Sequence, residues 1–231
     1  MSKYPIGWYK FEESKKIKKG KLYTINRFGK AFVCFRSSDE SVHIYDAYCP
    51  HLGAHLGVGG KIEKDKIVCP FHGWKYNTAG ECVEIPYCKS IPKRAQLQSY
   101  PSVEAARGIY VYFSEDFRKP EESIPAFLQK PDLDFRQLDS LQIDWNKYEK
   151  LSEIAVNSKF PIQAKGPGLF ISQESNSFKD FQMIISGTPL NDQVLDLTFS
   201  CSIDRNLNPF QKMKFKSTAK NQVEKILQHL L

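Results

Sequence analysis

Two short, similar segments constrain this chain more than any other feature of its sequence. Residues 49–53 read CPHLG and residues 69–73 read CPFHG, with 17 residues between His51 and Cys69. In a chain with six Cys and five His among 231 residues, each Cys-to-His spacing would arise by chance about 0.13 times, and both together with a chance of roughly 2%. Thiolates and imidazoles bind transition metals, and Gly and Pro let short loops bend toward one centre. The pattern predicts a metal centre built by two loops.

The side chains that would bind the metal are Cys49, His51, Cys69 and His72. Two kinds of centre use such a set. A zinc ion would take all four, but short-loop zinc sites usually belong to small domains that need the metal to fold. A 2Fe-2S cluster would take two cysteines on one iron and two histidines on the other. The chain is 41% hydrophobic, enough to build a core without a metal, which favours the cluster.

Short strands dominate the predicted secondary structure. β-branched and aromatic residues cluster between Gly, Pro, Asn and Asp from residue 7 to residue 113, which is typical of an all-β unit. The C-terminal part adds further strands and ends in a helix, with apolar residues at 223, 226, 227 and 230. The predicted strands are 21–27, 30–36, 42–48, 66–69, 108–113, 168–173, 178–186 and 193–203.

The stretches around the two segments resemble the Rieske family. Residues 49–57 (CPHLGAHLG) and 69–76 (CPFHGWKY) are similar to that family's two-loop signature. The resemblance implies that the two cysteines bind the inner iron of a 2Fe-2S cluster. It implies equally that the two histidines bind the outer iron.

The loops also differ from those of respiratory Rieske proteins, which carry a second cysteine in each loop and join them by a disulfide. Ala54 and Phe71 stand at those positions, so the bridge is not expected. Trp74 stands where a respiratory protein has a serine hydroxyl near the cluster, although Tyr76 remains as a donor. Fewer hydrogen bonds to the cluster favour the lower part of the Rieske range of reduction potential, about −150 to +300 mV.

Beyond the loops, the first 115 residues resemble the Rieske oxygenase branch that contains sterol 7-desaturases and ketosteroid hydroxylases. That branch joins the Rieske domain to a helix-grip catalytic domain. Residues 165–231 resemble its distal part, and the proximal part looks deleted. We therefore expect a mainly β protein with an α+β C-terminal part. Its expected units are a Rieske β-sandwich over 1–115, a linker or wrapping segment over 116–140, and a truncated helix-grip remnant over 141–231.

In this branch, two histidines and one carboxylate bind a mononuclear iron that activates oxygen. After residue 115 the chain holds one histidine, His229. Carboxylate and amide side chains near the expected position of the iron-binding helix have no histidine beside them. These are Asp144, Glu149, Glu153 and Asn157. The resemblance thus implies a degenerate member with no mononuclear iron and no catalytic residues, unable to hydroxylate or desaturate a sterol by itself.

Three functions are compatible with this sequence. The first is a pseudo-oxygenase that keeps the cluster as an electron-transfer or structural subunit of a larger assembly, with a mitochondrial respiratory complex as the favoured example. The second is a Rieske ferredoxin-like donor to a separate oxygenase. The third is an oxygenase or sterol desaturase whose iron ligands come from a partner chain. Each one implies protein partners.

Charge, apolar runs and cysteine content narrow the kinds of partner and compartment that this chain can have. The net charge is +7, with basic runs at 15–21 and 212–225 that we interpret as solvated faces, since neither has the aromatic context of a nucleic-acid site. The apolar runs fall far short of the roughly 18 residues that a membrane span needs, so any membrane association would be peripheral and through the complex. Sparse cysteines and no apparent signal peptide favour a reducing compartment. The predicted electron-transfer role favours a mitochondrial inner-membrane complex, and the cytoplasm is the alternative compartment.

The remaining histidines and cysteines have simpler interpretations. His55 is expected on a loop surface, His43 on the polar face of a strand, and His229 at a helix end. The other four cysteines are expected to pack as small apolar residues. They are Cys34, Cys82, Cys88 and Cys201.

Overall fold

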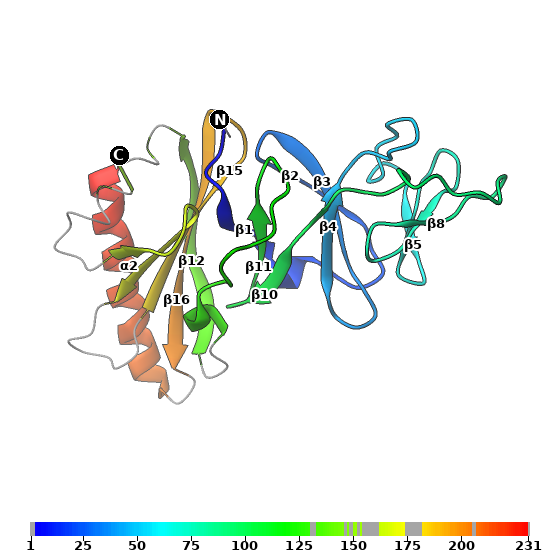
Figure 1. Ribbon diagram of the computed structural model, residues 1–231. Helices are drawn as coiled ribbons and strands as arrows, with labels where there is room; N and C mark the ends of the chain where they lie inside the picture. The colour runs from blue at the N-terminus through cyan, green and yellow to red at the C-terminus, as the bar shows by residue number, and fades with distance from the viewer. Residues whose placement is uncertain are drawn as a thin grey trace.

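Four antiparallel sheets and one long helix follow one another along an elongated molecule (Figure 1). The computed structural model describes residues 3–129, 133–145, 147, 150, 151, 153, 162–173, 182–204 and 207–230. The helix lies at one end and the sheet of the two predicted metal-binding loops at the other. The prediction of a mainly β protein with a C-terminal helix is confirmed.

The first 113 residues form three of the sheets. One has the order β1-β11-β10, the second β2-β3-β4-β9 and the third β5-β6-β7-β8. Every strand predicted in this part overlaps an observed one. The strands are β1 (Gly7–Glu13), β2 (Tyr23–Arg27), β3 (Lys30–Arg36), β4 (Val42–Asp46), β5 (Lys61–Glu63), β6 (Lys66–Val68), β7 (Lys75–Tyr76), β8 (Cys82–Glu84), β9 (Ser99–Tyr100), β10 (Ser102–Ala105) and β11 (Gly108–Phe113), with the short 3-10 helix η1 at Ser14–Lys16.

Two-residue turns close three of the hairpins in these sheets. The turns are Phe28-Gly29 between β2 and β3, Lys64-Asp65 between β5 and β6, and Ala106-Arg107 between β10 and β11. Both residues of each turn have φ between +47° and +67°. Positive φ at both central positions gives the turn the twist that matches right-handed strands. The first two of these turns fix the register of the two sheets that carry the predicted metal-binding loops.

A five-stranded sheet and the helix make up the C-terminal unit. The sheet has the order β12-β16-β15-β14-β13, and one of its faces is covered by the helix. Leu195, Leu197 and Phe199 of β16 pack against Phe215 and Val223 of the helix. The elements are β12 (Leu133–Asp144), β13 (Ile162–Ala164), β14 (Leu169–Gln173), β15 (Gln182–Pro189), β16 (Val194–Asp204) and α2 (Pro209–Leu230), preceded by the 3-10 helix η2 (Ala126–Gln129).

Strand β12 crosses the boundary expected between residues 140 and 141. The predicted boundary between residues 140 and 141 falls inside β12, and the segment 116–140 contains η2 and the first eight residues of this strand. A register shift between Gln137 and Asp139 hides this strand from the sequence pattern. Phe135, before the shift, packs toward the N-terminal unit, whereas Ile143, after it, packs toward α2. The apolar residues therefore lack the strict alternation that predicts a strand.

The two units are joined by hydrogen bonds and close packing. The backbone amides of Phe28 and Gly29 donate to the carbonyl oxygens of Pro189 and Leu190, both at 2.8 Å. The hydroxyl of Thr188 in β15 donates to the carbonyl oxygen of Lys10 in β1 at 2.7 Å. These bonds hold the Rieske-like unit against the five-stranded sheet. They leave the opposite end of the molecule, with the two loops, free of this contact (Figure 1).

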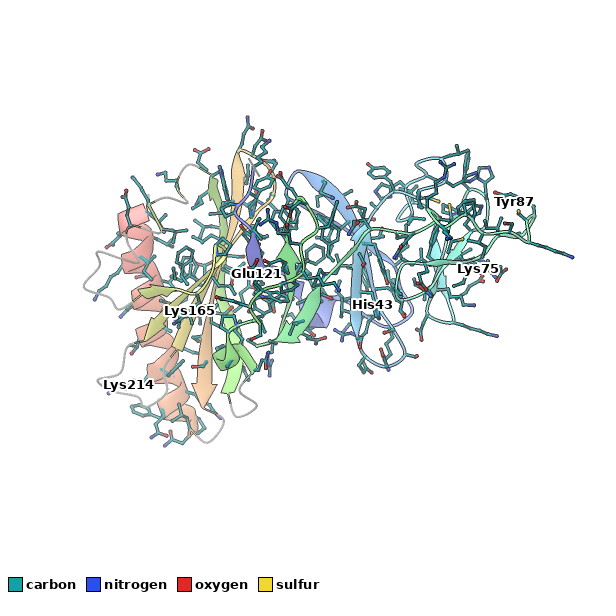
Figure 2. All side chains as sticks on the ribbon, viewed as in Figure 1. His43, Lys75, Tyr87, Glu121, Lys165 and Lys214 are labelled. Atoms are coloured by element: carbon teal, nitrogen blue, oxygen red, sulfur yellow. The ribbon has the colours of Figure 1, made fainter. Side chains whose placement is uncertain are left out.

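The basic run at 212–225 lies on α2, where Lys214, Lys216 and Lys220 are exposed. Lys214 is labelled at the helix end of the molecule in Figure 2. No helix among the described residues is long and apolar enough to cross a membrane.

Candidate metal centre

The two predicted metal-binding loops close in the same way. The amide of Cys49 donates to the carbonyl of Ala54, and the amide of Gly53 donates back to Cys49, both at 2.9 Å. The second loop repeats this pair of hydrogen bonds with matching residues. Cys69 donates to Trp74 at 2.9 Å and Gly73 donates to Cys69 at 3.1 Å.

The closing glycines explain why the segments share their last residue. Gly53 and Gly73 have φ of +71° and +70°, a region that costs a residue with a Cβ about 1–2 kcal/mol. Each loop is therefore a tight turn that starts at a cysteine and ends at a glycine. The histidine is the third residue of the first loop and the fourth of the second.

These loops bring the four predicted ligands into two pairs. The thiols of Cys49 and Cys69 are buried, each residue only 2% exposed, and they belong to one core cluster. The rings of His51 and His72 are partly exposed, with their centroids 4.8 Å apart at an angle of 69°. Two cysteines thus lie inside and two histidines lie side by side toward the surface.

A buried tyrosine contacts one of the thiols. The hydroxyl of Tyr76 lies 3.0 Å from Sγ of Cys49. Burial raises the pKa of the Cys49 thiol, while its hydrogen bond with Tyr76 acts in the opposite direction. Burial also raises the pKa of Tyr76 above its ordinary value, so the hydroxyl stays protonated. It can therefore donate a hydrogen bond to a thiolate. The role predicted for Tyr76 as a donor fits this geometry.

Trp74 lies against one of the histidines. Its ring stacks on His51 at 4.3 Å between centroids and 12° between planes. Its indole N–H donates to the hydroxyl of Tyr87 at 2.7 Å, and the Tyr87 ring lies 6.4 Å from that of His72. Tyr87 was not predicted from the sequence. It lies outside both loops, and no spacing relates it to them.

The donor set fits a 2Fe-2S cluster better than a zinc ion. The two thiols lie in the core and the two imidazoles lie toward the surface, so the donors form two separate pairs. A binuclear cluster needs one pair for each iron, whereas tetrahedral zinc needs all four around one point. The six cysteines form no disulfide in this structure.

His43 and His55 make contacts of their own, away from the two loop cysteines and the paired rings. His55 accepts a hydrogen bond from the amide of Gly57 and packs edge-on against Tyr48. His43 is half-buried on β4 and shares a hydrogen bond of 2.9 Å with Ser37. His229 belongs to α2, but its side chain lies outside the described part of the chain.

The N-terminal unit matches a known family. Residues 7–101 match the Rieske 2Fe-2S domain. This part of the chain is a Rieske domain. The family match also identifies the cofactor type as a Rieske 2Fe-2S cluster.

Curated relatives extend the likeness to sterol-modifying proteins. Cholesterol 7-desaturase nvd 1 of Ciona intestinalis is 40% identical over 122 residues, which is 53% of this chain and 26% of that protein. Cholesterol 7-desaturase nvd of Drosophila melanogaster is 43% identical over 111 residues, 48% of this chain and 26% of that protein. A probable 3-ketosteroid-9-alpha-monooxygenase, oxygenase component, of Rhodococcus rhodochrous is 31% identical over 131 residues, which is 57% of this chain and 32% of that protein. The matches span about a quarter to a third of these relatives.

Solved structures share the fold of nearly the whole chain. Apo dicamba monooxygenase has a TM-score of 0.70 at 14% identity, over 98% of this chain and 86% of that one. The oxygenase in a complex with the ferredoxin of carbazole 1,9a-dioxygenase has a TM-score of 0.67 at 16% identity. The match covers 98% of this chain and 79% of that one. At these identities the likeness establishes the fold. Because it covers nearly the whole chain, it includes the five-stranded sheet and α2.

The residues expected near an oxygenase iron are only partly described. Asp144 ends β12 and is exposed, and Glu153 is also exposed. Glu149 and Asn157 lie outside the described residues.

Proposed function

We propose that this chain is a pseudo-oxygenase, a Rieske protein that carries single electrons as a subunit of a larger redox assembly. Cys49 and Cys69 would hold the inner iron, and His51 and His72 the outer one. The observation that carries the assignment is the shared closure of the two loops, which buries both thiols and leaves both imidazoles adjacent at the surface. When bound, the cluster supplies reversible one-electron chemistry.

The arrangement of the protein groups suits electron transfer with a partner. The core holds the thiols away from water, where they are protected from oxidation and exchange. The partly exposed edges of His51 and His72 provide the surface through which electrons enter or leave. A partner would approach this end of the molecule, the end opposite α2 (Figure 1).

The proposal that the chain lacks its own oxygenase iron rests on its histidines. After Phe113, the end of β11, His229 is the one histidine in the sequence. A two-histidine, one-carboxylate site would need a second. Sterol desaturation is named for relatives of which the match covers about a quarter, so it is not carried over to this chain.

The assembly and compartment are part of this proposal. Solved relatives include an oxygenase bound to its ferredoxin, which supports a protein redox partner. We propose a mitochondrial inner-membrane complex as the assembly. A ferredoxin-like role in the cytoplasm is the competing hypothesis.

The cofactor assignment is tested by metal analysis and spectroscopy on matched variants. Purified protein should contain two irons and two acid-labile sulfides per chain, with the electron paramagnetic resonance (EPR) signal of a reduced Rieske cluster. His51→Ala should lose that signal, and His55→Ala should keep it, because His55 is not paired with the other imidazole. Stoichiometric zinc without sulfide, or loss of the signal in His55→Ala alone, would contradict the assignment.

The role is tested by purifying the protein under native conditions from its own cells. We expect it to copurify with a large complex. Free protein that a reductase readily reduces would support the ferredoxin-like role instead. A third iron per chain together with turnover of a sterol would overturn the pseudo-oxygenase proposal.

A further inference from the structure

An exposed segment outside the two loops packs against the second of them. Residues 86–94, here called the outer loop, are exposed throughout. A Cβ placed on Gly73 would lie 3.1 Å from Cγ of Pro86, so this loop rests directly on the glycine that closes the second metal-binding loop. Tyr87 follows Pro86 and lies near the tip of the molecule (Figure 2).

Tyr87 connects this exposed segment to a buried residue of the site. The tyrosine is 61% exposed, whereas Trp74, which donates its indole N–H to the Tyr87 hydroxyl, is 7% exposed. The hydrogen bond is 2.7 Å long, and Trp74 is in turn stacked on His51. The Tyr87 ring itself lies edge-on to His72, within the 4.5–7 Å range of interacting aromatic pairs. One surface tyrosine is thus connected to both paired histidines.

We propose that Tyr87 is a positioning residue for the metal centre. Its hydroxyl holds Trp74 flat on His51, and the outer loop thereby controls how much water reaches the histidine edge. The inference deepens the proposed function, because it requires a cluster bound by His51 and His72. It adds a regulatory element, since any contact that displaces the outer loop also changes the cluster's surroundings.

The charge of the cluster predicts whether releasing Trp74 raises or lowers the reduction potential. With two thiolates and two neutral imidazoles, the oxidised centre has no net charge and the reduced centre carries one negative charge. Water stabilises the charged state more than the neutral one. Releasing Trp74 from His51 admits water and therefore favours the reduced state, which raises the reduction potential. An indole stacked on His51 excludes water and therefore lowers the reduction potential.

The experiment compares two tyrosines of similar exposure in the purified holoprotein. Tyr87→Phe removes only the hydroxyl that accepts from Trp74. Tyr48→Phe is the matched control, because Tyr48 is 54% exposed and packs against His55 rather than against a paired histidine. Iron and sulfide content, the reduction potential and the EPR signal of the reduced state are measured for each.

We expect Tyr87→Phe to retain its cluster, to have a higher reduction potential than the wild type, and to show a shifted EPR signal. Tyr48→Phe should match the wild type in all three. Equal potentials for Tyr87→Phe and Tyr48→Phe would overturn the inference. A wild-type protein without a cluster would instead contradict the proposed function, so the two failures are distinct.

A second variant tests the pathway through the indole. Trp74→Phe keeps an aromatic ring near His51 but loses the N–H group, so its potential should shift in the same direction. The double variant should shift no further than the larger single variant, because both remove the same hydrogen bond. Fully additive shifts would show that Tyr87 does not act through Trp74.

Discussion

The hydroxyl oxygen of Tyr76 lies 3.0 Å from Sγ of Cys49, inside the core of the Rieske domain. When Cys49 is a thiolate, the Tyr76 hydroxyl donates this hydrogen bond to the sulfur of a predicted ligand. Hydrogen bonds to the sulfur ligands stabilise the reduced, more negative cluster and raise its potential. The reduction potential of this protein should therefore depend in part on the Tyr76 hydroxyl.

Tyr76→Phe is expected to lower the reduction potential by tens of millivolts. For one electron, about 59 mV corresponds to a tenfold change in the equilibrium constant, or about 1.4 kcal/mol, which is the usual scale of such a bond. A redox titration followed by visible circular dichroism measures the shift. Tyr45→Phe is the control, because the buried Tyr45 hydroxyl donates to the carbonyl of Thr78 rather than to a sulfur. Equal shifts in both variants would contradict the prediction.

Alanine at the two closing glycines should separate backbone strain from packing. Gly53→Ala and Gly73→Ala both place a Cβ at φ near +70°, which costs about 1–2 kcal/mol. Space is open around Gly53, whereas the new Cβ at Gly73 would press on Pro86. Gly73→Ala should therefore reduce the free energy of unfolding more, as measured by urea denaturation. A larger loss in Gly53→Ala would contradict the packing of the outer loop.

Gly168 should tolerate no side chain, because it allows the two units to approach closely. A Cβ there would lie 2.3 Å from Cδ1 of Tyr9, a fully buried ring of β1. Overpacking of this kind typically costs about 1–3 kcal/mol. Thermal unfolding and limited proteolysis should show that Gly168→Ala is less stable. Gly187→Ala, whose Cβ would meet Leu195 at an ordinary 3.4 Å, should stay close to the wild type.

His43 should make the protein less stable in mild acid. Burial lowers the pKa of His43, although Asp39 and Asp65 act in the opposite direction. Below the ordinary value of about 6.5, the unfolded chain takes up a proton that the folded protein does not. The free energy of unfolding should therefore fall as the pH drops through this window, by at most about 1.4 kcal/mol per pH unit from this group.

His43→Gln tests this prediction by chemical denaturation between pH 8 and pH 5. Each protein is compared with its own value at pH 8, where the imidazole is neutral in both states. The variant should lose less stability than the wild type on acidification. The same loss in both proteins would assign the effect to other groups.

Much of the fold and of the site could be predicted from the sequence. The strand predicted at Lys30–Arg36 has those bounds in the structure, because its apolar residues are flanked by turn residues. Spacing within a few residues predicts Cys49, His51, Cys69 and His72 as ligands, and the structure places the two rings side by side and both cysteines in one core cluster.

Features that depend on three-dimensional contacts were not predicted. The sequence pattern assigns part of β12 to a linker, because the register shift in this strand breaks the alternation of apolar residues. Tyr87 could not be recognised, because its contact with Trp74 arises only when the outer loop folds back onto the second metal-binding loop. Such contacts leave no periodic trace in a single sequence.

The hydrogen bonds from Phe28 and Gly29 to Pro189 and Leu190 have a consequence for how this architecture tolerates change. All four partners are backbone groups, and backbone groups are present whatever side chain a position carries. A junction of this kind tolerates substitution at most of its positions, provided the turn geometry at Gly29 survives. The two units of this chain can therefore keep their mutual orientation while the side chains around the junction change.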